Sequence, residues 1–298
     1  MRATLIFILK ALIGGGLLAF VISRIPLQDA LSVAVTIDPA TLAVAVALYF
    51  LAHAVNAAKL QVFLPDLSIW QAWRFTMIGV FYGTALPGQI AGDAVKAVRL
   101  ARAHADGDEG AAVAAVTVDK IVGIFALLLL VAFAIGIEAQ AFDRAVVLTA
   151  ALAAAVAVAG LVAAFLLPMP AWLGRFGASV SAWRSVSMRP MRLSYALLLG
   201  VLFQALCVAI CMILGAQLNI VLSAAAWTVV MGFSAIVLLA PITIAGIGVR
   251  EATLVGAIGY LGGSAVGAFA LSLVLFVINL IGAVVGLAVD LAGRDKVT

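Results

Sequence analysis

Two short stretches of the chain place a proline, glycines and a cation in otherwise apolar sequence. The first runs from Pro87 to Lys96 and the second from Pro241 to Arg250. A helix that begins at such a turn starts with backbone amides that have no partner inside the helix, and these amides attract anions. Because each stretch ends in a lysine or an arginine, both are predicted to bind an anionic group such as a phosphate.

Carboxylates near the two cations have two open roles: they balance the positive charge, or they carry a coupled proton or ion. Asp93 and Glu251 lie within three residues of the cations, and Asp119 precedes Lys120 in a later apolar run. A cation buried in a membrane protein needs a partner, so the counter-ion role is favoured and the coupling role stays open. With the turn residues, the candidate substrate-binding set is Pro87, Gly92, Asp93, Lys96, Asp119, Lys120, Pro241, Gly246, Gly248, Arg250 and Glu251.

Other kinds of site find little support in the sequence. Cys207 and Cys211 are four residues apart in an apolar run, as on one face of a helix, and are assigned neither a disulfide nor a metal. No His, Cys and carboxylate cluster has ligand spacing, and no nucleophile stands beside a base. We therefore expect a protein that is not an enzyme and that binds no cofactor or metal.

The two stretches are copies of one motif. Six positions keep their residue or their charge at an offset of 154 residues, namely Pro87/Pro241, Ile90/Ile244, Ala91/Ala245, Gly92/Gly246, Val95/Val249 and Lys96/Arg250. The same offset relates Trp73 to Trp227 and Leu100 to Leu254, outside the motif. Agreement over this length predicts an internal repeat.

The composition is that of a membrane protein. Hydrophobic residues make up 66% of the chain, charged residues 10%, and the mean hydropathy is +1.29. Soluble domains are roughly 45–50% apolar and about 25% charged. The net charge of +4 comes from bases between apolar segments, so no nucleic-acid partner is needed to explain it.

Six apolar runs are long enough to cross a membrane, since about 20 helical residues span the hydrocarbon. They cover residues 4–23, 40–58, 110–137, 145–167, 193–215 and 265–289. The first contains Lys10 and lacks a small-residue cleavage pattern, so we expect a retained span and not a signal peptide. At the end of the second run, Lys59 shares a helical face with His53 and Asn56, a set that more often ends a helix at the membrane interface.

The motif-bearing segments, residues 72–95 and 224–253, are broken by proline and glycine and do not fit as simple spans. If both are re-entrant helical hairpins, three spans separate them and the two halves of the chain are inverted. Inverted repeats with broken helices at mid-membrane are typical of secondary transporters. We therefore predict one all-α, polytopic membrane domain, with a first repeat over residues 1–144 and a second over 145–298.

The positive charges between spans predict the orientation in the membrane. Residues 168–192 contain four arginines and no acid, so this loop and both termini are expected on the cytoplasmic side. The loops at 138–144 and 216–223 then lie outside. Aromatic residues at helical spacing in the arginine-rich loop predict an interfacial helix over 172–190.

These motifs resemble one known family, the lysylphosphatidylglycerol synthase transmembrane region, whose members are flippase-like membrane proteins. The similar segments are Pro87…Ala91-Gly92-Asp93…Lys96, Asp119-Lys120 and Pro241…Gly246-Ile247-Gly248-Val249-Arg250-Glu251. The resemblance covers essentially the whole chain. Ala91 stands where the family usually has glycine, and lysine stands at 96 and 120 where arginine is common. Lysine lacks the bidentate fork of arginine, so a different headgroup preference is expected.

The resemblance implies translocation of anionic or modified phospholipids, or of polyprenyl-phosphate-linked carriers, across the bacterial inner membrane. The partner would be a membrane lipid, and the soluble synthase domain of larger relatives is expected to be absent. Two alternatives stay open: an ion-coupled transporter of a small anionic solute, and a non-transporting accessory protein of envelope-lipid biosynthesis. A homo-oligomer is compatible with all three.

Overall fold

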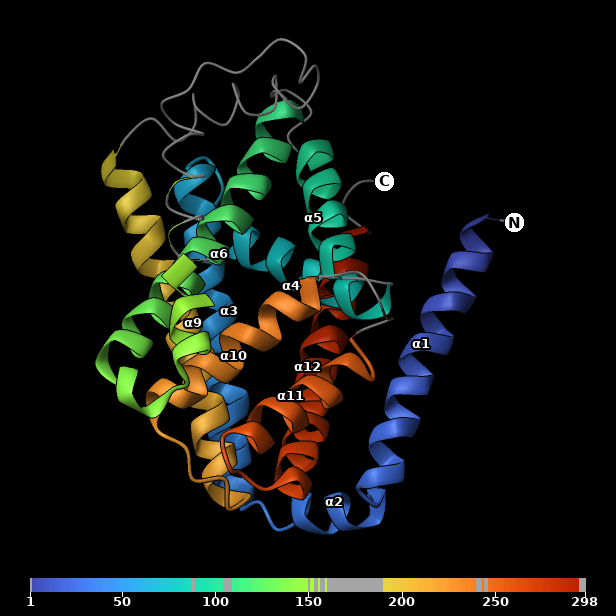
Figure 1. Cartoon of the computed structure of the whole chain (residues 1–298). Helices are drawn as coiled ribbons and strands as arrows, with labels where there is room; N and C mark the ends of the chain where they lie inside the picture. The colour runs from blue at the N-terminus through green and yellow to red at the C-terminus, as the bar shows by residue number, and fades with distance from the viewer. Residues whose placement is uncertain are drawn as a thin grey trace. The chain divides into compact units, whose positions relative to one another are not determined.

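The computed structural model describes residues 2–86, 89–103, 109–149, 190–239 and 246–294, together with residues 151, 152, 155, 159 and 243. Within these ranges the chain is helical and contains no strand (Figure 1). The predicted all-α class is therefore confirmed for the described part of the chain.

Ten α-helices and one short 3-10 helix have defined bounds in the described ranges. In chain order they are α1 (Arg2–Arg24), α2 (Leu27–Ala34), α3 (Pro39–Phe63), α4 (Ile69–Ala85), α5 (Gln89–Ala103), α6 (Glu109–Ile137), η1 (Ala139–Ala141), α9 (Pro190–Gln217), α10 (Ala224–Leu239), α11 (Val249–Tyr260) and α12 (Ala265–Arg294).

Four of these helices, α3, α6, α9 and α12, are long and apolar enough to cross a membrane. They coincide with four of the six predicted spans, those at 40–58, 110–137, 193–215 and 265–289. The chain is therefore a multi-pass membrane protein.

The other two predicted spans have different outcomes. The span at 4–23 coincides with α1, whose segment Lys10–Arg24 joins α2 at an angle of 82°, and this bent pair counts as a fifth span if the two helices cross together. The span at 145–167 lies largely outside the described residues, although residues 144–149 are helical. The interfacial helix predicted over 172–190 lies outside them as well, apart from its last residue.

Several helices begin at an N-cap serine, whose side chain accepts a hydrogen bond from a backbone N–H of the first turn. At the start of α4, the Ser68 hydroxyl accepts a hydrogen bond from the Gln71 N–H at 3.2 Å, and the Gln71 side chain accepts one from the Ser68 N–H at 2.9 Å. Ser223 and Ser264 each accept from a backbone N–H three residues later at 3.1 Å, before α10 and α12. These caps satisfy N–H groups that a helix start leaves unpaired.

The chain divides into two compact units. Unit 1 comprises Met1–Leu51, Met77–Val95 and Leu206–Thr298, and unit 2 comprises Ala52–Thr76 and Lys96–Ala205. In unit 1, α11 packs against α10 and α12, α1 packs against α11, and α2 packs against α12. The core of unit 1 includes the fully buried Trp227 and Leu254, two of the residues that mark the sequence repeat.

Unit 2 has its own buried clusters. Leu60 of α3, Leu100 of α5 and Val116 of α6 belong to one cluster. Val118 of α6 and Ala196 of α9 belong to a second. Helices α3, α5, α6 and α9 therefore contribute to the core of unit 2, in which α5 carries Lys96 and α6 carries Asp119.

Each motif segment is a pair of helices with a break between them. In unit 1, a Cβ atom on Gly92 of α5 would meet the backbone of Gly79 and Gly83 on α4, so these two helices touch through glycine. Helices α10 and α11 also pack against each other. The predicted break at each motif is present, whereas entry and exit of the pair from one membrane face stays a prediction.

Some helix ends follow the repeat. An offset of 154 residues relates the end of α3 at Phe63 to the end of α9 at Gln217. The same offset relates the end of α4 at Ala85 to the end of α10 at Leu239. These two pairs of helix ends agree with an internal repeat, and the two-repeat organisation and the inversion of its halves stay predictions.

Candidate functional site

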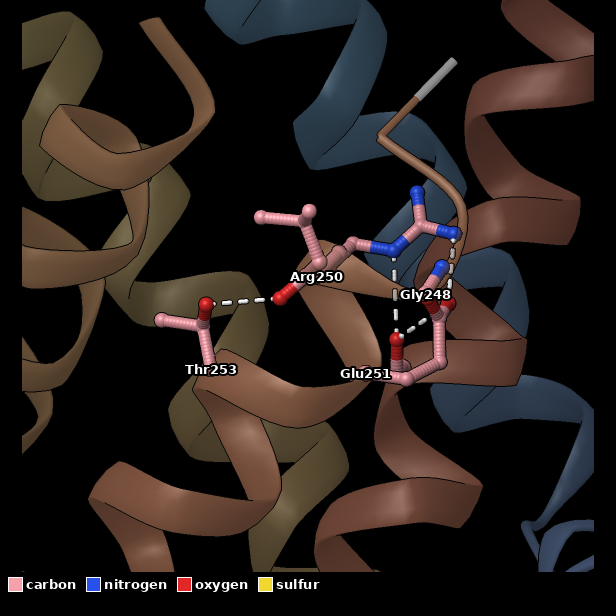
Figure 2. Close-up of polar contacts among 6 residues, drawn as sticks. Gly248, Arg250, Glu251 and Thr253 are labelled. Carbon is pink, nitrogen blue, oxygen red and sulfur yellow. Dashed lines mark hydrogen bonds and ion pairs between the residues drawn. The ribbon is translucent and has the colours of Figure 1, made fainter. Parts of the chain in front are cut away.

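Arg250 lies in the first turn of α11, and its side chain meets three neighbours in unit 1. Nη2 donates a hydrogen bond to Oε1 of Glu251 at 2.9 Å, and Nε donates one to Oγ of Ser272 on α12 at 3.1 Å. The guanidinium carbon lies 5.1 Å from the centre of the Phe276 ring, which places the cation over an aromatic face. Figure 2 shows the side chains of Arg250 and Glu251 turned toward each other at the start of the helix.

The Glu251 carboxylate accepts hydrogen bonds from three donors, although the residue is only 3% exposed. Oε1 accepts from Arg250 and, at 3.0 Å, from the hydroxyl of Ser272. Oε2 accepts from the backbone N–H of Gly248 at 2.6 Å (Figure 2). Charge-assisted bonds of this kind are stronger than those between neutral groups. The anion at the start of α11 is therefore a side chain of the protein itself.

The turn before α11 depends on glycine. Gly246 has φ +75° and Gly248 has φ +82°, in the left-handed region that favours glycine. A Cβ atom on Gly248 would also meet the carbonyl oxygen of Gly14 on α1, and one on Gly246 would lie 2.8 Å from Cδ2 of Leu238. Gly246 is therefore closely packed in the turn before α11. Gly92 is closely packed too, but inside helix α5.

Lys96 lies in a second polar cluster, in unit 2. Its ammonium donates a hydrogen bond to Oδ2 of Asp119 on α6 at 3.4 Å. The ammonium of Lys59, on α3, lies 3.3 Å from Oδ1 of the same carboxylate. All three residues are 3% exposed. Two buried lysines from different helices therefore share one carboxylate.

The expectation that both cations stand beside the first amides of a helix is correct for Arg250 and wrong for Lys96. Helix α11 begins at Val249, one residue before Arg250, whereas α5 begins at Gln89. Seven residues of α-helix rise about 10 Å, so Lys96 is two turns away from the amides at the start of α5. Its charge is balanced by a side chain on the following helix.

The structure brings together two subsets of the predicted residues: Lys96 with Asp119, and Gly248 with Arg250 and Glu251. Asp93 and Lys120 are half-buried on α5 and α6. Pro87 and Pro241 lie outside the described residues. Lys96 belongs to unit 2 and Arg250 to unit 1, so each cation is described within its own cluster.

Sequence reasoning missed Ser272 and gave Lys59 little weight. It also missed polar contacts of α12 within unit 1, where the hydroxyl of Tyr82 donates to Oδ2 of Asp290 at 3.1 Å. Asn279 accepts from Tyr49 at 3.2 Å and donates to Thr84 at 2.9 Å. A signal for these residues was present, because Ser272, Asn279 and Asp290 are 7 and 11 residues apart and so lie close to whole helical turns.

Within the described ranges, no group of three or more His, Cys, Asp or Glu side chains lies together in a way that could hold a metal ion. The polar groups that do lie together are cations with carboxylates and hydroxyls. Their chemistry is the binding of an anion by ammonium, guanidinium, hydroxyl and backbone N–H donors.

Comparison with protein families gives one match, to the lysylphosphatidylglycerol synthase transmembrane region, over residues 7–286. The matched range contains the residues of both polar clusters. A comparison with curated proteins found no match. The chain belongs to the lysylphosphatidylglycerol synthase transmembrane region family, as its motifs predicted.

Proposed function

We propose that the protein moves lipids with an anionic, phosphate-bearing headgroup from one leaflet of the bacterial inner membrane to the other. The lipid would be an anionic phospholipid or a polyprenyl-phosphate-linked carrier. The proposal assigns no chemical reaction on the lipid, and so the protein would not be an enzyme.

One observation carries the proposal: the two repeated motif cations are both held by buried carboxylates among apolar helices. Lys96 is 3% exposed and its partner Asp119 is equally buried. The side chain of Arg250 is 12% exposed and that of Glu251 4%. Charged side chains inside membrane-spanning segments are energetically unfavourable, and where they occur they commonly mark a substrate or ion pathway.

The donors around Glu251 suggest how a headgroup would bind. Arg250, Ser272 and the N–H of Gly248 converge on one carboxylate. A phosphodiester also carries one negative charge over two oxygens, so it could accept from the same donors in place of the carboxylate. The family match supports a lipid substrate, because the family's description names a derivative of phosphatidylglycerol, which contains a phosphodiester.

For the arrangement in the membrane, we propose six spans and two re-entrant hairpins in an inverted repeat, with both termini in the cytoplasm. Cysteine labelling in sealed cells tests this topology, in a background in which Cys207 and Cys211 are alanine. Val221 is 93% exposed in a predicted outside loop, so V221C should react with an impermeant maleimide. R102C, on the predicted inside, should react only after lysis. The reverse pattern would overturn the orientation.

Transport itself is tested with purified protein in liposomes that contain a fluorescent phosphatidylglycerol. Dithionite quenches the label only on the outer leaflet. In protein-free vesicles the inner-leaflet label is therefore protected, whereas a translocase brings it to the outer leaflet, where it is quenched. Labelled phosphatidylcholine, whose headgroup has no net charge, is the lipid control. The proposal predicts that the inner-leaflet signal of phosphatidylglycerol is lost faster than that of phosphatidylcholine. The assay is run once with and once without a pH gradient across the membrane. Equal rates with and without protein would reject it.

A further inference from the structure

Lys59 is buried and has a specific ionic partner, which a lysine that only ends a helix at the membrane interface would not need. It lies near the end of α3, is 3% exposed and reaches Oδ1 of Asp119, while Lys96 reaches Oδ2 of the same group. The carboxylate therefore lies between two ammonium groups, and each ammonium meets a different oxygen. No family match or motif identifies Lys59 as a site residue.

Two glycines leave the space that the Lys59 side chain occupies in unit 2. A Cβ atom on Gly123 of α6 would lie 3.0 Å from the Lys59 ammonium nitrogen. A Cβ atom on Gly200 of α9 would lie 3.7 Å from Cδ of Lys59. Gly123 is one helical turn after Asp119, so the same face of α6 supplies both the counter-ion and the room for the lysine.

Stability alone is a poor explanation for this arrangement. Replacing a buried set of ion pairs by well-packed apolar residues is often neutral or stabilising, because the ions lose their hydration when they are buried. A methionine at position 59 would fill the same slot without burying a charge. A buried Lys–Asp–Lys set in a membrane protein therefore suggests that the charges are used.

We propose that Lys59 and Lys96 form a clamp for the phosphate of an anionic lipid, and that Asp119 holds the clamp together when no headgroup is bound. This inference rests on the proposed function and adds Lys59 to its binding residues. A phosphodiester presents two oxygens that share one negative charge, as the carboxylate does, and can bridge the same two ammonium groups. Binding is then an exchange of one anion for another.

The test measures equilibrium binding of fluorescent phosphatidylglycerol to the purified protein in detergent. In Lys59→Met, Asp119 keeps Lys96 as a partner, so the variant should elute and melt like wild type. Its affinity for phosphatidylglycerol should fall by about tenfold or more, the loss expected for one charged hydrogen bond. Arg102→Met, which removes an exposed cation from α5, is the matched control and should bind like wild type.

A second pair of variants changes the clamp without changing any charge. Gly123→Ala places a methyl group against the Lys59 ammonium, whereas Gly136→Ala on the same helix meets nothing within 4 Å. Both exchanges favour the helix, so a loss of affinity in Gly123→Ala alone supports the clamp. If Lys59→Met fails to fold, this pair of variants tests the clamp in its place.

The competitor identifies the source of the phosphate. Unlabelled phosphatidylglycerol should displace the probe, and inorganic phosphate should not; displacement by inorganic phosphate at similar concentration would support the clamp but overturn the lipid as its ligand. If Lys59→Met and Gly123→Ala bind like their controls while Lys96→Gln binds weakly, the clamp is wrong and the proposed function stands. If the wild-type protein binds no phosphatidylglycerol, both are wrong.

Discussion

The two motif cations occupy equivalent positions in the repeat and reach nearly the same place on the next helix. Lys96 contacts Asp119, 23 residues further along the chain, and Arg250 contacts Ser272, 22 residues further along. The two motifs therefore agree in a side-chain contact as well as in sequence. In each case a cation on the shorter motif helix contacts the long helix that follows.

The counter-ions differ between the two clusters. Asp119 lies on a different helix from Lys96 and is shared with Lys59 of a third helix. Glu251 is the neighbour of Arg250 and also accepts from the N–H of Gly248 at the helix start. The first cluster thus requires the packing of three helices, whereas the second is largely built by one turn. Lysine acts as a point charge that can share a carboxylate, while arginine's planar fork reaches two acceptors from one side.

The two motifs should differ strongly in how well they tolerate a larger side chain at the turn before α11 and at the equivalent position of α5. Gly248→Val combines a positive φ with a contact against the Gly14 carbonyl and should lower the free energy of unfolding by at least about 3 kcal/mol. The equivalent residue in the first repeat is Ala94, which is exposed on α5. Ala94→Val should lower it by less than about 1 kcal/mol, the range of helix propensity. Denaturant titration in mixed micelles measures both, and equal effects would remove the distinction between a turn-built and a helix-built cluster.

An effect of comparable size is expected at the shared carboxylate of the first cluster. Asp119→Leu removes the counter-ion of Lys59 and should destabilise the protein by about 3–5 kcal/mol, as breaking a buried pair does. The double variant Lys59→Met/Asp119→Leu should recover part of this loss, because one of the buried ammonium groups is then removed as well. A double-mutant cycle measures the coupling. Additive losses would mean that Lys59 and Asp119 do not interact.

The smallest effect distinguishes two buried serines of unit 1. Ser272 bonds to both Arg250 and Glu251, so Ser272→Ala should lower the free energy of unfolding by about 1 kcal/mol. The hydroxyl of Ser234 is buried and has no hydrogen-bond partner within the described ranges. Ser234→Ala should therefore be neutral or stabilising. The opposite ranking in thermal unfolding would contradict the role given to Ser272.

Much of the fold could be predicted from the sequence because a membrane imposes simple rules. Length and apolarity were sufficient for α3, α6, α9 and α12, and proline and glycine located the breaks between α4 and α5 and between α10 and α11. The sequence could not show that α5 begins six residues earlier in its repeat than α11. That difference depends on local backbone conformation, namely the two positive φ angles before α11.

The candidate site was predicted less completely, and the reason is tertiary packing. Arg250 and Glu251 are adjacent in the chain, so their pairing could be expected. Lys59 and Asp119 are far apart in sequence and meet only because α3 and α6 pack together in unit 2. Ser272 looked like an ordinary small residue in an apolar span, and only the direction of the Arg250 side chain identifies it.

The central claim is that Lys96 and Arg250 each contribute to the binding of a phosphate-bearing lipid headgroup, each in its own cluster. The most direct measurement is the affinity of purified Lys96→Gln and Arg250→Gln for fluorescent phosphatidylglycerol, with elution and melting as checks of the fold. Asp119 retains Lys59, and Glu251 retains Gly248 and Ser272, so both variants should stay folded. Each should bind about tenfold or more weakly than wild type, since each loses a charged hydrogen bond. Folded variants that both bind with wild-type affinity would contradict the account.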